Sequence, residues 1–268
     1  MSPLREINGV RLLVEESGSG PALVLVHGSW DDRRSWGRIE NELSRRYRVV
    51  SYDRRGHTGS DDGYPAGTRR TDEDDLAEII EALGLAPAHV VASSFGGSIS
   101  LGLAARRPEL VQTVCAHEPP LLSIAADDPE VARVFETMRS LLELIDRGER
   151  EAAARGFADD IALGRGSWAM IPTDVRASMV ANAETAAGEV RDPEWAQLDL
   201  DGLSRAGVPL LVTQGNTSPL FFRRIIERLA AAVEGAEVRT LPGAGHLPHL
   251  THPAEYVAAV RGFIERSA

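Results

Sequence analysis

The sequence predicts an α/β fold, in which a mostly parallel, twisted sheet is flanked by helices and carries a helical cap insertion. Short apolar runs alternate along the chain with stretches of helical periodicity, a pattern typical of buried parallel strands joined by helices. The strands are expected at residues 9–16, 22–26, 47–52, 89–92, 111–116, 209–213 and 237–241. The helices that join them are expected at residues 72–83, 95–106, 219–233 and 253–266.

The middle third of the chain has a different pattern. Residues 121–203 hold no clear strand run and carry helical patterns such as 131–145 and 174–187. A chain of 268 residues is long enough to form one large core. We therefore expect a single core domain built from residues 1–120 and 204–268, with residues 121–203 as a helical cap.

The charge composition narrows both the partner and the chemistry. The formal net charge is −11, whereas binding to nucleic acid or an anionic membrane needs a basic surface, so a small-molecule partner is expected. All 29 basic residues are arginine, which excludes a Schiff-base lysine, a pyridoxal-phosphate attachment site, a P-loop lysine and a Ser-Lys dyad. No metal or organic cofactor is expected, and a homodimer is left open.

Several features predict where the protein resides. The chain has no apolar run near the roughly 20 residues that a membrane span needs, and its first residues do not read as a secretory signal. The single cysteine, Cys115, lies in an apolar strand pattern and is expected to be a buried thiol without a catalytic role. We expect a cytoplasmic protein, and the richness in Arg and Ala indicates a bacterial source of high GC content.

The most informative segment is residues 90–97 (VVASSFGG), where an apolar strand runs through a turn of small residues into a helix. A nucleophile on so sharp a turn has strained backbone geometry, and the residues two before and two after it must be small. Ala92 and Gly96 meet this requirement around Ser94, whereas around Ser93 a valine and a phenylalanine would fill these positions. Ser94 is therefore the expected nucleophile, although a Gly/Ser-rich loop without chemistry would give the same pattern.

An earlier apolar run ends in the sequence HGSW at residues 27–30, and together with the elbow it resembles the α/β-hydrolase family. The resemblance implies an α/β-hydrolase fold and a serine hydrolase whose oxyanion hole uses the backbone N–H groups of Ser29 and Phe95. The segment SYDRRGHTGS at residues 51–60 resembles the family's D-x-R-G-x-G-x-S stretch, which is structural there. His57 is accordingly not expected to be catalytic.

The C-terminal segment LPGAGH ends at His246, just after the last expected strand, where the family carries its general base. An imidazole with a pKa near neutrality can take the proton of a serine and return it to a leaving group. His249 and His252 lie close by, and three histidines could also suggest a metal site. No carboxylate completes a recognised ligand spacing such as H-E-x-x-H, so we expect no metal, and His252 is expected to cap the last helix.

The acid that would orient the histidine is not at the family's usual place. That place follows the expected strand 209–213 in a G-x-x-D pattern, but the residues here are GNTS at 215–218. Some family members take the carboxylate from the end of the preceding strand instead. Glu118 follows the apolar run 111–116 at the edge where a parallel sheet collects its active-site groups. We expect Glu118 to orient His246; the alternatives are an incomplete triad or a solvated loop glutamate.

One subgroup of the family is more similar than the rest, namely the lactone hydrolases that open zearalenone and their relatives. The shared features are the segments CAHEPP at 115–120, GNTSPLFF at 215–222 and the stretch 241–253. The cap differs, because residues 183–187 hold no aromatic side chain where those lactonases are expected to place a tryptophan. Five further residues are expected to contact substrate: Trp30, His117, Trp168, Trp195 and Pro219. Ordinary packing is the alternative for Trp168 and Trp195, and a structural role is the alternative for His117.

The predicted function is hydrolysis of a carboxylic ester or lactone, with a zearalenone-like macrolactone as the narrowest version, through an acyl-enzyme formed on Ser94. Thioesterases and carbon-carbon bond hydrolases use the same triad, so both remain alternatives. A serine at the elbow argues against haloalkane dehalogenases and epoxide hydrolases, which use aspartate as nucleophile. A protein of another class, a non-catalytic or biosynthetic ligand-binding protein, could keep the same fold without turnover.

Overall fold

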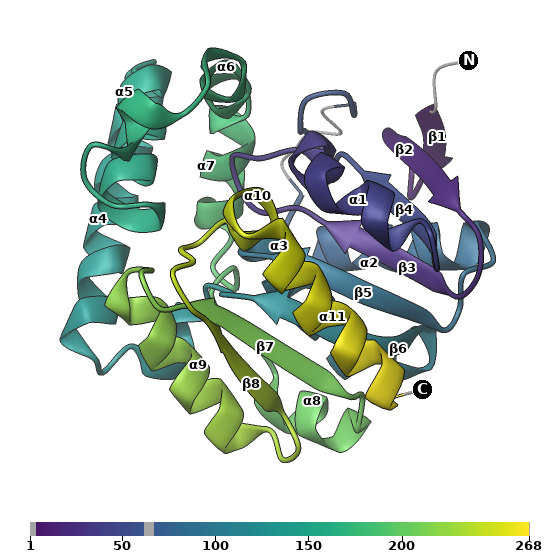
Figure 1. Ribbon diagram of the computed structural model, residues 1–268. Coiled ribbons are helices and arrows are strands. Elements are labelled where there is room, and N and C mark those ends of the chain that lie inside the picture. Colours follow the sequence, from purple (N-terminus) through teal and green to yellow (C-terminus); the bar gives the residue numbers. More distant parts are fainter. Residues whose placement is uncertain (1–3, 62–66, 268) are drawn as a thin grey trace.

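The computed structural model describes residues 4–61 and 67–267, and it confirms the predicted α/β architecture (Figure 1). One eight-stranded sheet has the strand order β1-β2-β4-β3-β5-β6-β7-β8. Strands β1 and β2 are antiparallel to their neighbours, and the strands from β4 to β8 are parallel. The strands are β1 (Leu4–Ile7), β2 (Val10–Gly18), β3 (Ala22–Val26), β4 (Arg48–Tyr52), β5 (Ala88–Ser93), β6 (Val111–His117), β7 (Leu210–Gly215) and β8 (Glu237–Leu241).

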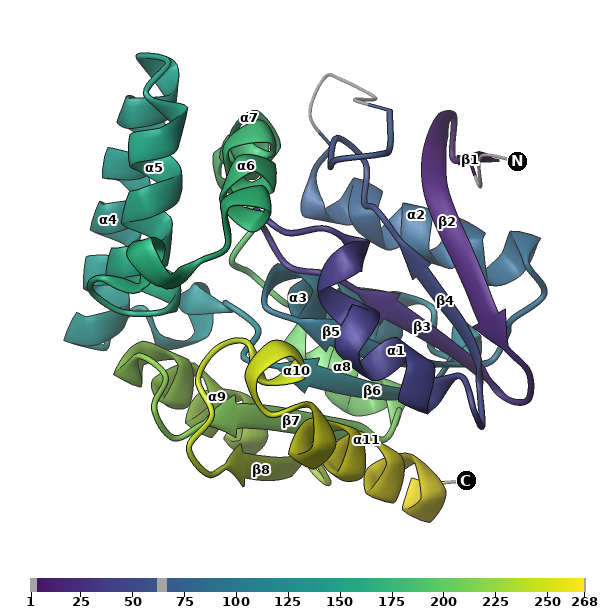
Figure 2. The same cartoon turned by 45° about the horizontal axis from the view of Figure 1, so that its top comes forward.

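Helices cover both faces of the sheet, which explains why the parallel strands have continuous apolar runs. Alternate residues of one strand enter two separate cores: Val90 faces the first and Val91 the second. Helices α2 (Arg69–Ala82), α3 (Phe95–Arg106), α8 (Leu200–Ala206) and α9 (Leu220–Ala232) pack on the first face. Helices α1 (Gly37–Leu43) and α11 (Pro253–Ser267) pack on the other, with the short α10 (Pro248–Thr251) beside them (Figure 2).

The chain between β6 and β7, all of which the structure describes, contains helices and no strand. Helices α4 to α7 of this stretch stand beyond the end of the sheet where β6 finishes (Figure 1), and they contribute to a separate apolar core. The division into a core and a cap at residues 121 and 203 stays a prediction. The elements ahead of α8 are η3 (Leu122–Ala125), α4 (Pro129–Asp146), α5 (Arg150–Gly156), η4 (Phe157–Ala162), η5 (Ser167–Met170), α6 (Thr173–Ala181) and α7 (Ala183–Arg191).

Several short elements of the core were not expected from the sequence, β1 and α1 among them. Strand β1 has four residues at the sheet edge, and α1 has seven, so both are too short to show a clear periodicity. Within residues 4–61 and 67–267, no helix combines the length and the apolar character that crossing a membrane requires. Residence in the cytoplasm and a homodimer stay predictions.

Candidate active site

Ser94 occupies a sharp turn between β5 and α3. Its backbone has φ 52° and ψ −125°, a conformation that L side chains rarely adopt and that occurs at functional turns. A Cβ atom on Gly96 would overlap the carbonyl oxygens of Val26 and His27 at the end of β3. A Cβ on Gly28 would lie 2.9 Å from that of Ser94. The two glycines therefore let the end of β3 lie directly against the serine.

His246 and Glu118 form a buried pair. The Nδ1–H group of His246 donates a hydrogen bond of 2.7 Å to Oε2 of Glu118. The second carboxylate oxygen of Glu118 accepts a bond of 2.8 Å from the backbone N–H of Gly215 at the end of β7. The imidazole ring also stacks on Phe222, with 4.4 Å between the ring centroids. These contacts fix both the orientation and the tautomer of the histidine.

Glu118 lies at the end of β6 with φ 46°, and its side chain is fully buried. Burial by itself would raise the pKa of this carboxyl, but the neighbouring His117 and His246 hold it well below the ordinary value. His117 Nε2 is 3.5 Å from Glu118 Oε2, and its Nδ1 is 2.9 Å from the hydroxyl of Thr213. The site therefore keeps an ionised acid in an interior that would otherwise neutralise it.

Ser94 and His246 line one small cavity beneath the cap. Its volume is about 30 Å³, well below the roughly 300 Å³ or more of a typical ligand site. No hydrogen bond joins Ser94 to His246 among the described residues, and such bonds often tighten only when substrate is present. Two of its other lining side chains are polar, and these are bonded to each other: Ser29 and Glu189. The rest of the lining is apolar: Phe95, Pro120, Leu122, Val134, Met138, Phe157, Ile161, Val190, Trp195, Phe221 and Phe222.

Both residues expected to form the oxyanion hole, Ser29 and Phe95, therefore border the same cavity as Ser94. The loop that carries Ser29 is held by His27, whose Nδ1–H donates to the carbonyl of Gly28 at 2.8 Å and whose Nε2 accepts from the backbone N–H of Arg54 at 2.9 Å. Burial, reinforced by the Arg54 charge, lowers the pKa of His27 to about 3. This histidine is therefore neutral and positions the loop.

No motif of the sequence indicated Glu189, a buried carboxylate of α7 that also borders this cavity. Its two oxygens accept hydrogen bonds from the hydroxyl of Ser29 and from the guanidinium of Arg54. Arg54 belongs to the D-x-R-G-like stretch and donates a further bond of 3.2 Å to Asp72. His57 lies beside this network, fully buried, and burial lowers its pKa well below the ordinary value, consistent with a structural role.

Of the five residues expected to contact substrate, Trp195 borders the cavity, whereas the other four are not among its described lining residues. His117 is fully buried behind Glu118. Trp30 stacks on Phe157 at 5.3 Å, and Trp168 packs inside the cap core. Pro219 begins α9. Phe222 of that helix stacks on His246, Phe221 packs against Phe222, and both line the cavity.

Three of the described side chains lie close enough together to hold a metal ion. Ligand atoms of His117, Glu118 and His246 lie within 4.8 Å of one another, but the carboxylate and the His246 nitrogen already face each other in a hydrogen bond. Within the described chain, His249 and His252 do not join this group. His249 is buried against Trp36, and the carbonyl of His252 accepts the N–H of Tyr256 in the first turn of α11.

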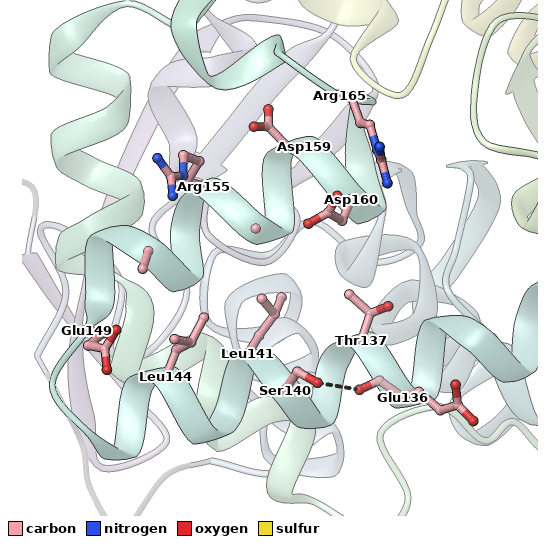
Figure 3. A pocket seen from close by; sticks show the side chains of 12 residues that line it. Glu136, Thr137, Ser140, Leu141, Leu144, Glu149, Arg155, Asp159, Asp160 and Arg165 are labelled. Carbon is pink, nitrogen blue, oxygen red and sulfur yellow. Dashed lines mark hydrogen bonds between the residues drawn. The ribbon is translucent and has the colours of Figure 1, made fainter.

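A second and larger hollow, of about 890 Å³, lies within the cap between α4 and the segment from α5 to η4 (Figure 3). Charged side chains of both signs surround it, including Glu136, Asp160 and Arg165. None of Ser94, Glu118 or His246 is among its lining residues. The placement of the reactive groups, and not the size of the hollow, identifies the candidate active site.

Comparison with known proteins assigns the chain to a family. The model of the Alpha/beta hydrolase family matches residues 23–260. The chain belongs to this family. A relative from Mesorhizobium japonicum named 2-(acetamidomethylene)succinate hydrolase is 29% identical over 270 residues, which cover 97% of this chain and 94% of that protein.

Two solved structures of α/β hydrolases share the fold. A thermophilic esterase from Thermogutta terrifontis superimposes with a TM-score of 0.79 at 22% identity, covering 96% of this chain and 94% of the other. An enol-lactonase from Burkholderia xenovorans LB400 gives a TM-score of 0.71 at 24% identity, covering 98% and 100%. At these identities the likeness establishes the α/β-hydrolase fold, and the zearalenone-type subgroup stays a prediction.

The loop after β7, where α/β hydrolases usually carry the acid, makes a different set of contacts in this chain. The side-chain oxygen of Asn216 accepts the backbone N–H of Gly243 at 2.7 Å. The hydroxyl of Thr217 donates to the carbonyl of Ala244 at 2.7 Å. Both bonds tie the loop after β7 to the loop that carries His246. The residues that replace the usual aspartate therefore help to position the histidine loop, while Glu118 contacts the histidine itself.

Proposed function

We propose that this α/β hydrolase cleaves carboxylic esters or lactones through an acyl-enzyme, with Ser94 as nucleophile, His246 as general base and Glu118 as the orienting acid. The observation that carries the proposal is the 2.7 Å hydrogen bond from His246 to a buried, ionised glutamate, beside a serine on a strained elbow. The names of the similar proteins, an esterase and an enol-lactonase among them, support the same class of reaction.

The first half of the reaction acylates the serine. The Ser94 hydroxyl attacks the carbonyl carbon of the ester as Nε2 of His246 takes its proton. Backbone N–H groups of Ser29 and Phe95 stabilise the negative oxygen of the tetrahedral intermediate. Collapse of the intermediate breaks the carbon-oxygen bond, and the alcohol leaves with the proton from His246. Glu118 stabilises the imidazolium that exists between these two proton transfers.

The second half of the reaction releases the acid. His246 takes a proton from a water molecule, which attacks the acyl carbon, and the ester bond to Ser94 breaks as the serine regains its proton. For a lactone, acid and alcohol are parts of one molecule, and the product is a hydroxy acid. A zearalenone-like macrolactone is the narrowest substrate we propose, and it requires the walls of the present cavity to move apart, since about 30 Å³ cannot hold it.

A substrate panel tests this function. We expect wild-type protein to hydrolyse p-nitrophenyl esters of increasing chain length, or aromatic macrolactones including zearalenone, and Ser94→Ala to lose this activity by about a thousandfold or more. Stoichiometric labelling of Ser94 by a fluorophosphonate separates an enzyme from a non-catalytic binding protein. A folded wild type that neither labels nor turns over any substrate would refute the proposal.

The role of Glu118 has its own test. Glu118→Gln should lower kcat by about ten thousandfold, because an amide neither fixes the productive tautomer of His246 nor stabilises its charged form. Glu237→Gln is a matched control, since Glu237 is paired with Arg266 at the surface, at the start of β8, and it should leave kcat unchanged. Near wild-type kcat in Glu118→Gln would assign the acid to another residue.

A further inference from the structure

The cavity is asymmetric in its polarity. Besides Ser94 and His246, the polar side chains at its walls are Ser29 and Glu189, and the other lining residues are apolar. Glu189 is 3% exposed, and it enters the cavity wall from the cap helix α7. A carboxylate that borders an otherwise apolar substrate cavity is costly to desolvate, so its contacts determine what it offers to a ligand.

Among residues 4–61 and 67–267, the arginine that pairs with the charge on Glu189 is Arg54, which is shared with Asp72. Burial raises the pKa of Asp72 to about 7. When Asp72 is protonated the cation of Arg54 balances Glu189, and when Asp72 is ionised the cluster is net negative. Burial keeps the nearby His27 and His57 neutral. In neither state does the described cluster present an unpaired cation to a substrate.

Glu189 still has capacity to accept hydrogen bonds. Ser29 and Arg54 each occupy one position on the carboxylate, and two carboxylate oxygens provide about four acceptor positions. A hydroxyl or amide N–H group of a substrate can use a remaining position. A second carboxylate there would have no cation to pair with and would be repelled by Glu189.

We propose that Glu189 determines substrate specificity, by accepting a hydrogen bond from a donor group of the ester and by excluding esters that carry a carboxylate. The proposal rests on the proposed ester hydrolysis at Ser94 and narrows its substrate class to apolar esters with an uncharged hydrogen-bond donor. Glu189 is neither the acid nor the base of the reaction. Its expected effect is therefore on selectivity between substrates.

Two isosteric esters test the inference, the p-nitrophenyl monoesters of glutaramic acid and of glutaric acid, which end in an amide and in a carboxylate. Wild type should favour the amide in kcat/KM by about 100-fold, because placing like charges together costs several kcal/mol. Glu189→Gln should reduce this preference at least about tenfold, corresponding to ~1.4 kcal/mol. Ser94→Ala supplies the background rate for both esters.

Glu184→Gln is the matched control, because Glu184 lies on the same helix α7, is exposed, and pairs with Arg150. It should keep the wild-type preference, which excludes an effect of net charge alone. If thermal unfolding shows that Glu189→Gln does not fold, the double variant Glu189→Met with Arg54→Met removes both charges together and should lose the preference equally.

Two results would overturn the inference while leaving ester hydrolysis intact. The first is equal kcat/KM of wild type on the two esters, and the second is an unchanged preference in a folded Glu189→Gln. Failure of the proposed function looks different, because wild type would then turn over neither these two esters nor any uncharged ester of the wider panel, and the specificity assigned to Glu189 would fall with it.

Discussion

The two cap walls of the active-site cavity are attached to the protein in different ways. Helix α7 contributes Glu189 and is bonded to loops of the core along its whole length. The opposite wall, from α4 and η4, contributes apolar side chains such as Met138 and Phe157. Polar bonds anchor α7 from Asn182 at its start to Asp192 at its end: Asn182 to Asp31 and Thr58, Thr185 to Gly56, Glu189 to Arg54 and Ser29, and Asp192 to Arg69.

This difference indicates which wall can yield to a substrate. Directional hydrogen bonds and buried ion pairs hold one arrangement, because breaking them leaves buried groups unsatisfied. Apolar contacts can slide and repack at lower cost. Since the cavity of about 30 Å³ is too small for an ester of ordinary size, we infer that α7 stays in place and that side chains of α4 and η4 make the room.

The largest effect should come from the centre of the polar wall. Arg54→Met leaves Glu189 and Asp72 buried without their cation, and it should lower the free energy of unfolding by about 3–5 kcal/mol. Chemical denaturation monitored by circular dichroism measures this loss. Arg150→Met, which breaks the exposed pair with Glu184, is the control and should cost less than about 1 kcal/mol.

If Arg54→Met lowered the free energy of unfolding no more than Arg150→Met does, the proposed difference between the two cap walls would be wrong. It would mean that the carboxylates around Arg54 become protonated or hydrated without penalty, so that the polar bonds of α7 do not fix its position. The double variant Arg54→Met with Glu189→Met sharpens the test, because a smaller loss than in the single variant would assign the penalty to the unpaired charge of Glu189.

The sequence could predict the parts of the site that depend on local backbone geometry. The elbow at Ser94 requires small neighbours, and these requirements can be recognised in a short segment. Glu118 could be located because the ends of parallel strands meet at one sheet edge. Glu189 could not be located from the sequence, because its contacts with Ser29 and Arg54 join residues more than a hundred positions apart. No local sequence pattern encodes such contacts.

The differences between the expected substrate contacts and the described lining of the cavity have a similar cause. An aromatic residue type indicates burial but not the cavity that the ring faces. Trp30 and Trp168 are both buried, yet they pack with the cap core, whereas Trp195 reaches the cavity. The direction of each side chain depends on how the cap helices pack, and the sequence gives that packing least reliably.

A smaller effect is expected on the apolar wall. Met138→Ala removes a side chain that is 9% exposed and should lower the free energy of unfolding by about 2 kcal/mol. It should also raise kcat/KM for long-chain p-nitrophenyl esters relative to short ones, because the cavity becomes wider. Ser140→Ala, at an exposed position of the same helix, should change neither quantity. An unaltered chain-length preference would show that this wall does not limit the substrate.

The smallest effect tests a single anchor of α7. The hydroxyl of Thr185 donates a 2.6 Å hydrogen bond to the carbonyl of Gly56, and Thr185→Val removes the donor while keeping the shape. The expected loss in the free energy of unfolding is about 1 kcal/mol. Thr137→Val is the control, because the described partner of the Thr137 hydroxyl lies within α4, the carbonyl of Arg133, where water can replace it. A Thr185→Val loss no greater than the control would mean that the charged bonds of Glu189 hold α7 without help from its neutral anchors.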